Sequence, residues 1–354
     1  MEFPVRRRQF YLRQLFLSAT PFYIKFSVLI SVGRTNQFQG VKITDTLSKQ
    51  RDVESGFRTI NQYVVHQTLG EGSFAKVKLV HVTHRPYVLF AMKVVHRGLN
   101  KTISDYLLSP LQPDQKQEEL TINTEVAIMK KINHPNIVRL FEVIDDKSVN
   151  KLYMILELMK GGSCYKIGQQ PLNEDDARSD IRDIIVGVSY MHKNHIVHHD
   201  IKPDNLLRNR RGIIKIGDFG LSSYYEDMTA KIRETKGTAA FIPPEAVDTT
   251  NYPDGYLPSL ADIYSIGATL FMIIYGHPPY NLPNKYDLYK QIINEPIPFD
   301  SDENKETTKR ISSDLRNLLE GTLEKDPLKR MTIEQMRQHP WVTYNGTIPL
   351  PDEV

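Results

Sequence analysis

The sequence lacks several features that mark particular classes of protein. Cys164 is the only cysteine in 354 residues, which excludes an internal disulfide framework and a zinc site built from several cysteines. Lysine and arginine number 45 against 42 acidic residues, a net charge of +3, so no overall basic excess favours a nucleic-acid partner. No internal repeat or low-complexity tract is present. The apolar share of 40% and the charged share of 25% are those of a globular protein, and the single cysteine fits a reducing, cytoplasmic location.

Acidic residues are nearly absent from the first 34 positions, where Glu2 is the only one among basic, aromatic and aliphatic residues. One interpretation is an organelle presequence. A second is a segment that lies on an anionic membrane surface, and a third is a plain extension or a start site placed too far upstream. Lys25 splits the apolar run and Pro21 would break a helix, so no transmembrane span is predicted.

Apolar periodicity divides the remaining chain into a strand-rich part and a helix-rich part. Residues 35–60 are polar and mixed and are interpreted as a linker, and residues 97–118 as an inserted loop. Alternating apolar residues and β-branching predict strands within 63–70, 76–82, 87–95, 137–144 and 152–158. A helical period is expected from Leu120 to Ile132, ahead of the H-P-N turn at 134–136.

Beyond Gly161 and Gly162 the pattern is mainly helical. A helix is predicted from Glu174, capped by Asn173, with further helices at 260–275, 285–293, 312–323 and 332–338. Strands followed by helices predict an α+β fold with two lobes. The expected division is an extension and linker at 1–60, a small lobe at 61–159, a large lobe at 160–343 and a tail at 344–354.

Two short strings carry the chemistry. I-V-H-H-D-I-K-P-D-N-L-L begins at Ile196, and I-I-K-I-G-D-F-G ends at Gly220. In this pattern Asp200 can accept a proton from a substrate hydroxyl and Lys202 can neutralise a moving phosphoryl group. Asn205 and Asp218 can hold Mg²⁺ against ATP phosphates. Phosphoryl transfer depends mostly on positioning and charge stabilisation, so these residue types indicate that reaction.

A glycine-rich stretch precedes these strings and has the order Gly70, Glu71, Gly72, Ser73, Phe74, Ala75. Glycine lets a backbone approach phosphates closely, although Ala75 stands where a third glycine is usual and the pair alone is a weak signal. Lys93 follows on the third predicted strand. Glycine loop, strand lysine, helix glutamate, H-x-D-x-K-x-x-N and D-F-G together occur in the order that a protein kinase requires.

On these motifs, residues 63–343, about four fifths of the chain, resemble a protein serine/threonine kinase catalytic domain. Lys202, two residues after the base, resembles the serine/threonine pattern and not the tyrosine-kinase pattern. The chain is most similar to the calcium/calmodulin-dependent protein kinase kinases and to related upstream kinases of AMP-activated protein kinase. The strings that carry this likeness are N-Q-Y at 61–63, L-Y-M-I-L-E-L at 152–158, P-L-N-E-D-D-A-R at 171–178, G-T-A-A-F-I-P-P-E at 237–245 and H-P-W-V-T at 339–343.

The resemblance implies ATP and Mg²⁺ as substrate and cofactor and assigns further roles. Lys93 would hold the α- and β-phosphates and pair with Glu125, and Thr238 would help to place the substrate hydroxyl. Leu156 would gate the back of the adenine pocket, while Glu157 and Met159 would present hinge backbone groups. The adenine would lie between Leu69, Val77, Ala91 and Leu207.

The resemblance also assigns structural roles. Glu245 would form a buried ion pair with Arg330. Met129, Leu140, His198 and Phe219 would stack as an apolar column tied to Asp262.

Some positions depart from the family pattern. His199 replaces the usual arginine before the catalytic aspartate, and histidine is a weaker, pH-dependent phosphate partner. Glu234 stands where many related kinases carry an activating threonine, so we expect activity without loop phosphorylation; Thr235 is a candidate phosphosite. The insert at 97–118 is not basic, and no basic amphipathic helix follows the last predicted helix, so calmodulin is not a predicted partner.

The sequence therefore predicts a serine/threonine kinase that acts on protein substrates, among them activation-loop threonines of downstream kinases. One alternative is a pseudokinase that serves as an ATP-binding scaffold. Another is a calmodulin-kinase-like enzyme with non-kinase substrates. The sequence makes no prediction of the oligomeric state or of a regulatory ligand.

Overall fold

The computed structural model describes residues 40–51, 56–72, 75–96 and 124–352. The chain divides into two compact units, Met1–Gln39 and Gly40–Val354, and every described residue belongs to the second. The predictions for the segment at 1–34, for the insert at 97–118 and for Ser73 and Phe74 lie outside the described residues.

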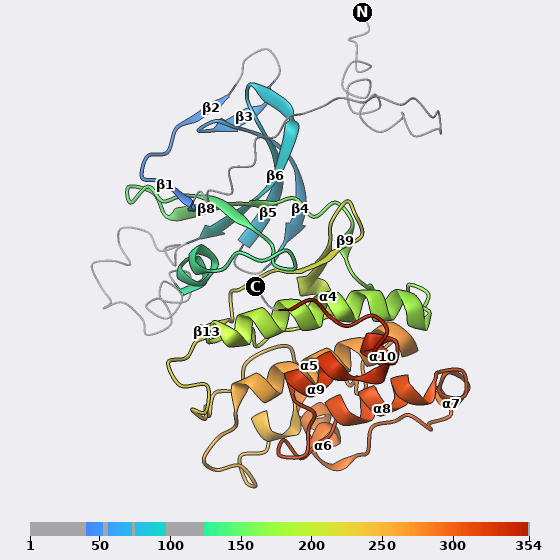
Figure 1. Ribbon diagram of the computed structural model, residues 1–354. Coiled ribbons are helices and arrows are strands. Elements are labelled where there is room, and N and C mark those ends of the chain that lie inside the picture. The colour runs from blue at the N-terminus through green and yellow to red at the C-terminus, as the bar shows by residue number, and fades with distance from the viewer. Residues whose placement is uncertain (1–39, 52–55, 73–74, 97–123, 353–354) are drawn as a thin grey trace, which may run out of the picture. The chain divides into compact units, whose positions relative to one another are not determined.

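The small lobe is an eight-stranded sheet with the strand order β1-β7-β8-β6-β5-β4-β3-β2 (Figure 1). Neighbouring strands are antiparallel except β1, which pairs with β7 in parallel. The five strands predicted from Tyr63 onward are confirmed as β4 to β8. The strands are β1 (Lys42–Thr44), β2 (Lys49–Arg51), β3 (Arg58–Ile60), β4 (Tyr63–Glu71), β5 (Ala75–Val82), β6 (Arg85–His96), β7 (Leu140–Ile144) and β8 (Lys151–Glu157).

The two faces of this sheet differ in what they contact, because one packs in an apolar cluster and the other lies at the candidate site. Val80, Met92 and Ile155 are fully buried in an apolar cluster on one face. Because successive side chains of a strand point to opposite faces, Ala91 and Lys93 of β6 lie on the other face, the one used by the candidate site. Residues 124–131 form the predicted helix, with Ile128, Met129 and Ile132 buried.

The prediction of a linker at 35–60 is wrong for part of this stretch, because β1, β2 and β3 lie within it and belong to the sheet. Glu142 of β7 is 2% exposed and accepts hydrogen bonds from Thr44 (2.5 Å), Tyr63 (2.7 Å) and Lys42 (2.9 Å). These contacts join positions 79 to 100 residues apart. Strands of three residues have too few side chains to show a periodicity, so no sequence pattern indicated them.

The large lobe is helical, as predicted, and the α+β architecture with two lobes is confirmed (Figure 1). Short strands β9 (Gly162–Ser163), β10 (Ile196–Val197), β11 (Leu206–Arg208), β12 (Ile214–Ile216) and β13 (Ser223–Tyr224) lie among its helices. The helices are α4 (Glu174–Lys193), α5 (Pro258–Tyr275), α6 (Lys285–Asn294), α7 (Lys305–Thr308), α8 (Ser313–Thr322), α9 (Ile333–Gln338) and α10 (Pro340–Thr343). Three short 3₁₀ helices are η1 (Pro203–Asn205), η2 (Ala239–Phe241) and η3 (Pro244–Ala246).

Helices α4 and α5 form the centre of the large lobe. The side chain of Asn173 caps α4 by accepting the Asp176 N–H at 2.9 Å, as predicted. The apolar face predicted for α4 is fully buried and consists of Ile181, Ile184, Ile185, Val188 and Met191. Among the described residues, α5 is the one helix long and apolar enough to cross a membrane, and 89% of that window is buried inside the protein, as for a core helix.

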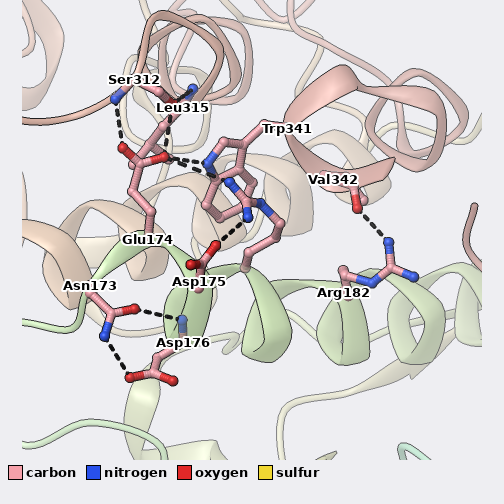
Figure 2. A network of polar contacts seen from close by, with 10 residues as sticks. Asn173, Glu174, Asp175, Asp176, Arg182, Ser312, Leu315, Trp341 and Val342 are labelled. Carbon is pink, nitrogen blue, oxygen red and sulfur yellow. Dashed lines mark hydrogen bonds and ion pairs between the residues drawn. The ribbon is translucent and has the colours of Figure 1, made fainter. Parts of the chain in front are cut away.

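The first turn of α4 also fixes the carboxyl-terminal helices, as Figure 2 shows. The Glu174 carboxylate accepts hydrogen bonds from the Ser312 N–H (2.6 Å), the Ser312 hydroxyl (2.7 Å) and the Trp341 indole N–H (2.8 Å). About two turns further along α4, the Arg182 guanidinium donates to the carbonyls of Val342 and Ile348. One helix therefore holds the starts of α8 and α10 and the chain that follows them.

Candidate active site

The loop after β10 is held by one buried carboxylate. Asp262 of α5 has no exposed surface and accepts from the His198 N–H, the His199 N–H and His192 Nε2, each at 2.9 Å. Burial opposes the charge of Asp262, but the hydrogen bond and the nearby histidines hold its pKa below the usual value. These bonds support His199 in a left-handed backbone conformation (φ 68°), which is costly for such a residue and directs the next residue, Asp200.

The Asp200 carboxylate contacts three polar side chains. Its Oδ1 accepts from the Thr238 hydroxyl at 2.7 Å, and its Oδ2 lies 2.8 Å from Lys202 Nζ and 2.9 Å from Asn205 Nδ2. Lys202 Nζ also donates to the Thr238 hydroxyl at 2.6 Å. The structure thus brings together the predicted base, the predicted phosphate-neutralising lysine and the threonine expected to place a substrate hydroxyl.

Lys93 joins the two lobes. Its Nζ lies 2.6 Å from Glu125 Oε1 in the helix at 124–131 and 2.9 Å from Asp218 Oδ1 in the large lobe. Burial disfavours the charge on Lys93, but the two carboxylates outweigh it and raise its pKa. Burial likewise opposes ionisation of Asp218, and Lys93 outweighs it and lowers the pKa of that carboxyl. Lys93 and Asp218 are therefore both charged at neutral pH.

The predicted metal ligands lie at the open end of the β11–β12 hairpin. The Gly217 N–H donates to the Asn205 carbonyl at 2.8 Å, which places Asp218 beside the loop that carries Asn205. Because Asn205 directs its amide NH₂ to Asp200, its amide oxygen is the atom left to ligate. Mg²⁺ is usually bound through one or two carboxylates together with substrate phosphates, and an amide oxygen with a carboxylate fits that chemistry.

A model of the protein kinase domain matches residues 63–342. The chain belongs to the protein kinase family. Protein kinases use ATP as phosphoryl donor and Mg²⁺ as its metal, as predicted.

Comparison with individual kinases shows which members of the family the chain is similar to. It is 34% identical over 330 residues to a calcium/calmodulin-dependent protein kinase kinase of Caenorhabditis elegans, covering 90% of this chain and 59% of that protein. It is 36% identical over 312 residues to the serine/threonine-protein kinase GRIK2 of Arabidopsis thaliana (87% and 72% covered). It is also 36% identical over 316 residues to the serine/threonine-protein kinase ssp1 of Schizosaccharomyces pombe (87% and 46%). The predicted resemblance to this group of serine/threonine kinases is confirmed, and the chain spans about half the length of the first and third of these relatives.

The residues expected around the nucleotide come from both lobes of the kinase domain. Gly70 and Glu71 end β4, Gly72 follows it and Ala75 begins β5, with the Gly72 N–H donating to the Ala75 carbonyl at 2.8 Å. The predicted adenine contacts are distributed over five strands as Leu69 on β4, Val77 on β5, Ala91 on β6, Leu156 on β8 and Leu207 on β11.

The hinge follows β8. The Glu157 carboxylate is tied to Lys215 Nζ at 2.8 Å, and the Glu157 N–H donates to the Arg139 carbonyl at 2.9 Å. The Met159 carbonyl accepts from the Gly162 N–H at 3.2 Å. The Met159 N–H has no partner among the described residues and is therefore the hinge donor left for an adenine edge.

The structure does not support the predicted role of His199 as a pH-dependent phosphate partner. Its ring is buried and Nε2 lies 3.0 Å from the Tyr225 hydroxyl. Burial, more than any nearby charge, lowers the pKa of His199 to about 4, so the ring is neutral at physiological pH and cannot neutralise a phosphate. Instead, Lys236 Nζ lies 3.1 Å from the Ser223 hydroxyl and 3.4 Å from the Glu234 carboxylate.

Thr235, the candidate phosphosite, is exposed in this segment, and its hydroxyl donates to the Ala246 carbonyl at 2.7 Å. Next to it, Gly237 fixes the activation segment to the catalytic loop. Its φ is +104°, and a Cβ at this position would lie 2.4 Å from the His199 carbonyl oxygen. Only glycine fits both the left-handed conformation and the close approach, and Thr238 is thereby held over Asp200.

The residues expected to be structural come from both lobes. The Arg330 guanidinium contacts Glu245 through two bonds of 2.5 and 2.8 Å, and both side chains are fully buried. His198 packs edge-on against Phe219 with ring centroids 5.3 Å apart. Met129 and Leu140 belong to the same buried core.

Sequence reasoning missed several residues that support the site. His192 on α4, Tyr225 and Lys236 in the activation segment, and Lys215 behind the hinge all contact site residues. Lys215 lies inside the string I-I-K-I-G-D-F-G but has no catalytic role in that motif, and the other three residues lie outside the short motif strings. Their partners are from 13 residues away, for Lys236 and Ser223, to 70 residues away, for His192 and Asp262, so the spacing within the motifs does not indicate them.

Proposed function

We propose that this chain is an active serine/threonine protein kinase that transfers the γ-phosphate of MgATP to hydroxyl groups of protein substrates. The observation that carries the proposal is the paired geometry of Lys93, which contacts Glu125 at 2.6 Å and Asp218 at 2.9 Å. A catalytically competent kinase requires the strand lysine paired with the helix glutamate and the D-F-G aspartate in place.

The chain's own residues divide the work of the reaction. MgATP supplies the γ-phosphoryl group when it is bound. The Asp200 carboxylate accepts the proton of the substrate hydroxyl, and the Thr238 hydroxyl, bonded to Asp200 Oδ1, limits where that substrate can sit. Lys202 and Lys93 stabilise negative charge on the phosphates, and Asn205 and Asp218 supply oxygen ligands for the metal.

Downstream kinases are the proposed substrates, phosphorylated on activation-loop threonines. This is supported by similarity to a protein named for phosphorylating other protein kinases. The test is incubation of the chain and labelled ATP with a panel of catalytically inactive kinase domains, followed by mapping of phosphosites by mass spectrometry. Label on the activation-loop threonine of at least one domain is the expected result, and label confined to non-kinase proteins would support a calmodulin-kinase-like enzyme instead.

The rival function is an ATP-binding scaffold without transfer activity. Retention of Lys93, Asp200, Asn205 and Asp218 argues against it, since loss of one of these marks a pseudokinase. The variant Asp218→Asn separates the two. We expect it to lose phosphate transfer by several orders of magnitude while it stays folded. Equal transfer by the variant and the parent chain would indicate a contaminating kinase and favour the scaffold.

A cytoplasmic location is proposed together with this function, because a single, buried cysteine suits a reducing compartment. Fractionation of cells that express the full chain or a chain without residues 1–34 tests it. Recovery of the full chain with membranes or organelles, and of the shortened chain in the soluble fraction, would assign a targeting role to that segment.

A further inference from the structure

Helix α6 presents an aromatic and basic surface to solvent. We name as the α6 patch the residues Leu282, Lys285, Tyr286, Tyr289 and Lys290. Tyr286 is 66% exposed and Leu282 is 38% exposed, and both lysines are exposed. Residues 285, 286, 289 and 290 are spaced so that they share one side of a helix, while Leu288 and Ile292 are buried against Tyr280.

The α6 patch combines chemical groups that are typical of protein interfaces. Lys290 Nζ lies 4.4 Å from the centre of the Tyr286 ring, and Lys285 Nζ lies 5.3 Å from that of Tyr289. Neither lysine forms an ion pair with an acidic side chain in the described part of the chain. Aromatic residues contribute large contact areas in interfaces, and cations on aromatic rings remain free to meet an anionic partner.

The α6 patch adjoins the segment that positions the substrate. Helix α6 contacts η2 and η3, and Ala239 of η2 and Tyr289 pack against the same apolar cluster. Ala239 directly follows Thr238, whose hydroxyl contacts Asp200. A protein whose hydroxyl reaches Asp200 therefore lies close to α6, whereas a short peptide bound in the cleft alone does not cover it.

We propose that the α6 patch docks an acidic surface of a folded protein substrate and so adds affinity that a short peptide cannot gain. This inference rests on the proposed function, since it names a second recognition element for the same reaction. In the complex, acidic side chains of the substrate contact Lys285 and Lys290, and an apolar side chain packs against Tyr286 and Leu282. The site then selects substrates by a folded surface as well as by the residues around the acceptor.

The experiment compares two probes that share one acceptor threonine. The first is a catalytically inactive kinase domain that the panel above shows to be phosphorylated, and the second is a synthetic peptide spanning its activation loop. The variant is Tyr286→Ala combined with Lys290→Glu, in the full chain. The control is Lys309→Glu, which removes an exposed lysine directly after α7. Among the described residues its one ion pair is with Glu306 on the surface, and such a pair contributes little.

We expect the double variant to raise KM for the folded domain about tenfold, equivalent to about 1.4 kcal/mol, with kcat/KM for the peptide unchanged within about twofold. The Lys309→Glu variant should match the parent chain with both probes. Equal losses with domain and peptide would show a structural effect and overturn the docking site, as would no loss with either.

Binding provides a readout independent of turnover. The dissociation constant of the inactive domain, measured by fluorescence anisotropy, should rise about tenfold for the double variant, and equal binding by parent and variant would refute docking at α6. A parent chain that binds the inactive domains of the panel but transfers no phosphate to any of them would instead contradict the proposed function. The two failures are thus distinguishable.

Discussion

The buried pair of Glu245 and Arg330 should make a large and measurable contribution to the stability of the large lobe. Both side chains are fully buried, and Arg330 also donates to the carbonyls of Glu324 at 2.8 Å and Leu260 at 3.0 Å. Replacing one partner leaves the other charge in a dry site. We therefore expect Glu245→Leu or Arg330→Met to lower the free energy of unfolding by about 3–5 kcal/mol, which corresponds to a fall in Tm of about 10 °C.

The fluorescence of a buried tryptophan can be used for this measurement. Trp341 is the only tryptophan and is 2% exposed in the same lobe, so its fluorescence during urea denaturation reports the unfolding of this lobe. The double variant Glu245→Leu, Arg330→Met should cost much less than the sum of the single changes, because no unpaired charge remains. The control is Arg316→Met, which breaks a partly exposed pair with Glu320 and should cost less than about 1 kcal/mol. If Arg330→Met costs no more than this control, the reasoning fails.

Three further predictions concern the catalytic and activation segments. Gly237→Ala should reduce kcat by at least about a hundredfold with little change in overall fold by circular dichroism, because its Cβ would meet the His199 carbonyl; near-normal turnover would contradict this. The pKa of His199 is lowered to about 4, so its neutral form contributes stability that is complete above about pH 6.5 and is lost as pH falls toward 4, by up to about 3 kcal/mol. Urea titrations across that range should show a shallower acid loss for His199→Gln, and parallel curves would count against the assignment. Phosphatase-treated enzyme should keep most of its activity, because Lys236 contacts Glu234 and Ser223 without a phosphate; a collapse by orders of magnitude would refute phosphorylation independence.

The features that could be predicted from the sequence are those that a local periodicity or a short catalytic motif determines. The strands from Tyr63 to Glu157, the cap at Asn173 and the apolar face of α4 follow periodicities that a single window contains. Asp200, Lys202, Asn205 and Asp218 lie within one short stretch of chain, so chemistry fixes their spacing and the motif could be recognised without a structure.

The rest depends on contacts between distant segments. No pattern near residue 142 indicates that strands at 42–44 supply its hydrogen-bond partners. The prediction for His199 used the pKa of a free histidine, whereas burial beside Tyr225 decides its charge in the folded chain. Tertiary environment, which a sequence window does not contain, controls both outcomes.

The parallel pairing of β1 with β7 has a practical consequence for anyone who trims this chain. A fragment limited to the span that matches the kinase family, 63–342, would uncover the hydrogen-bonding edge of β7 and leave the Glu142 carboxylate without Thr44 and Lys42. Open sheet edges recruit other chains, and a shielded acid that keeps Tyr63 but loses two of its donors weakens the lobe around it. Residues ahead of the recognised domain are therefore part of the smallest piece expected to fold and remain monodisperse.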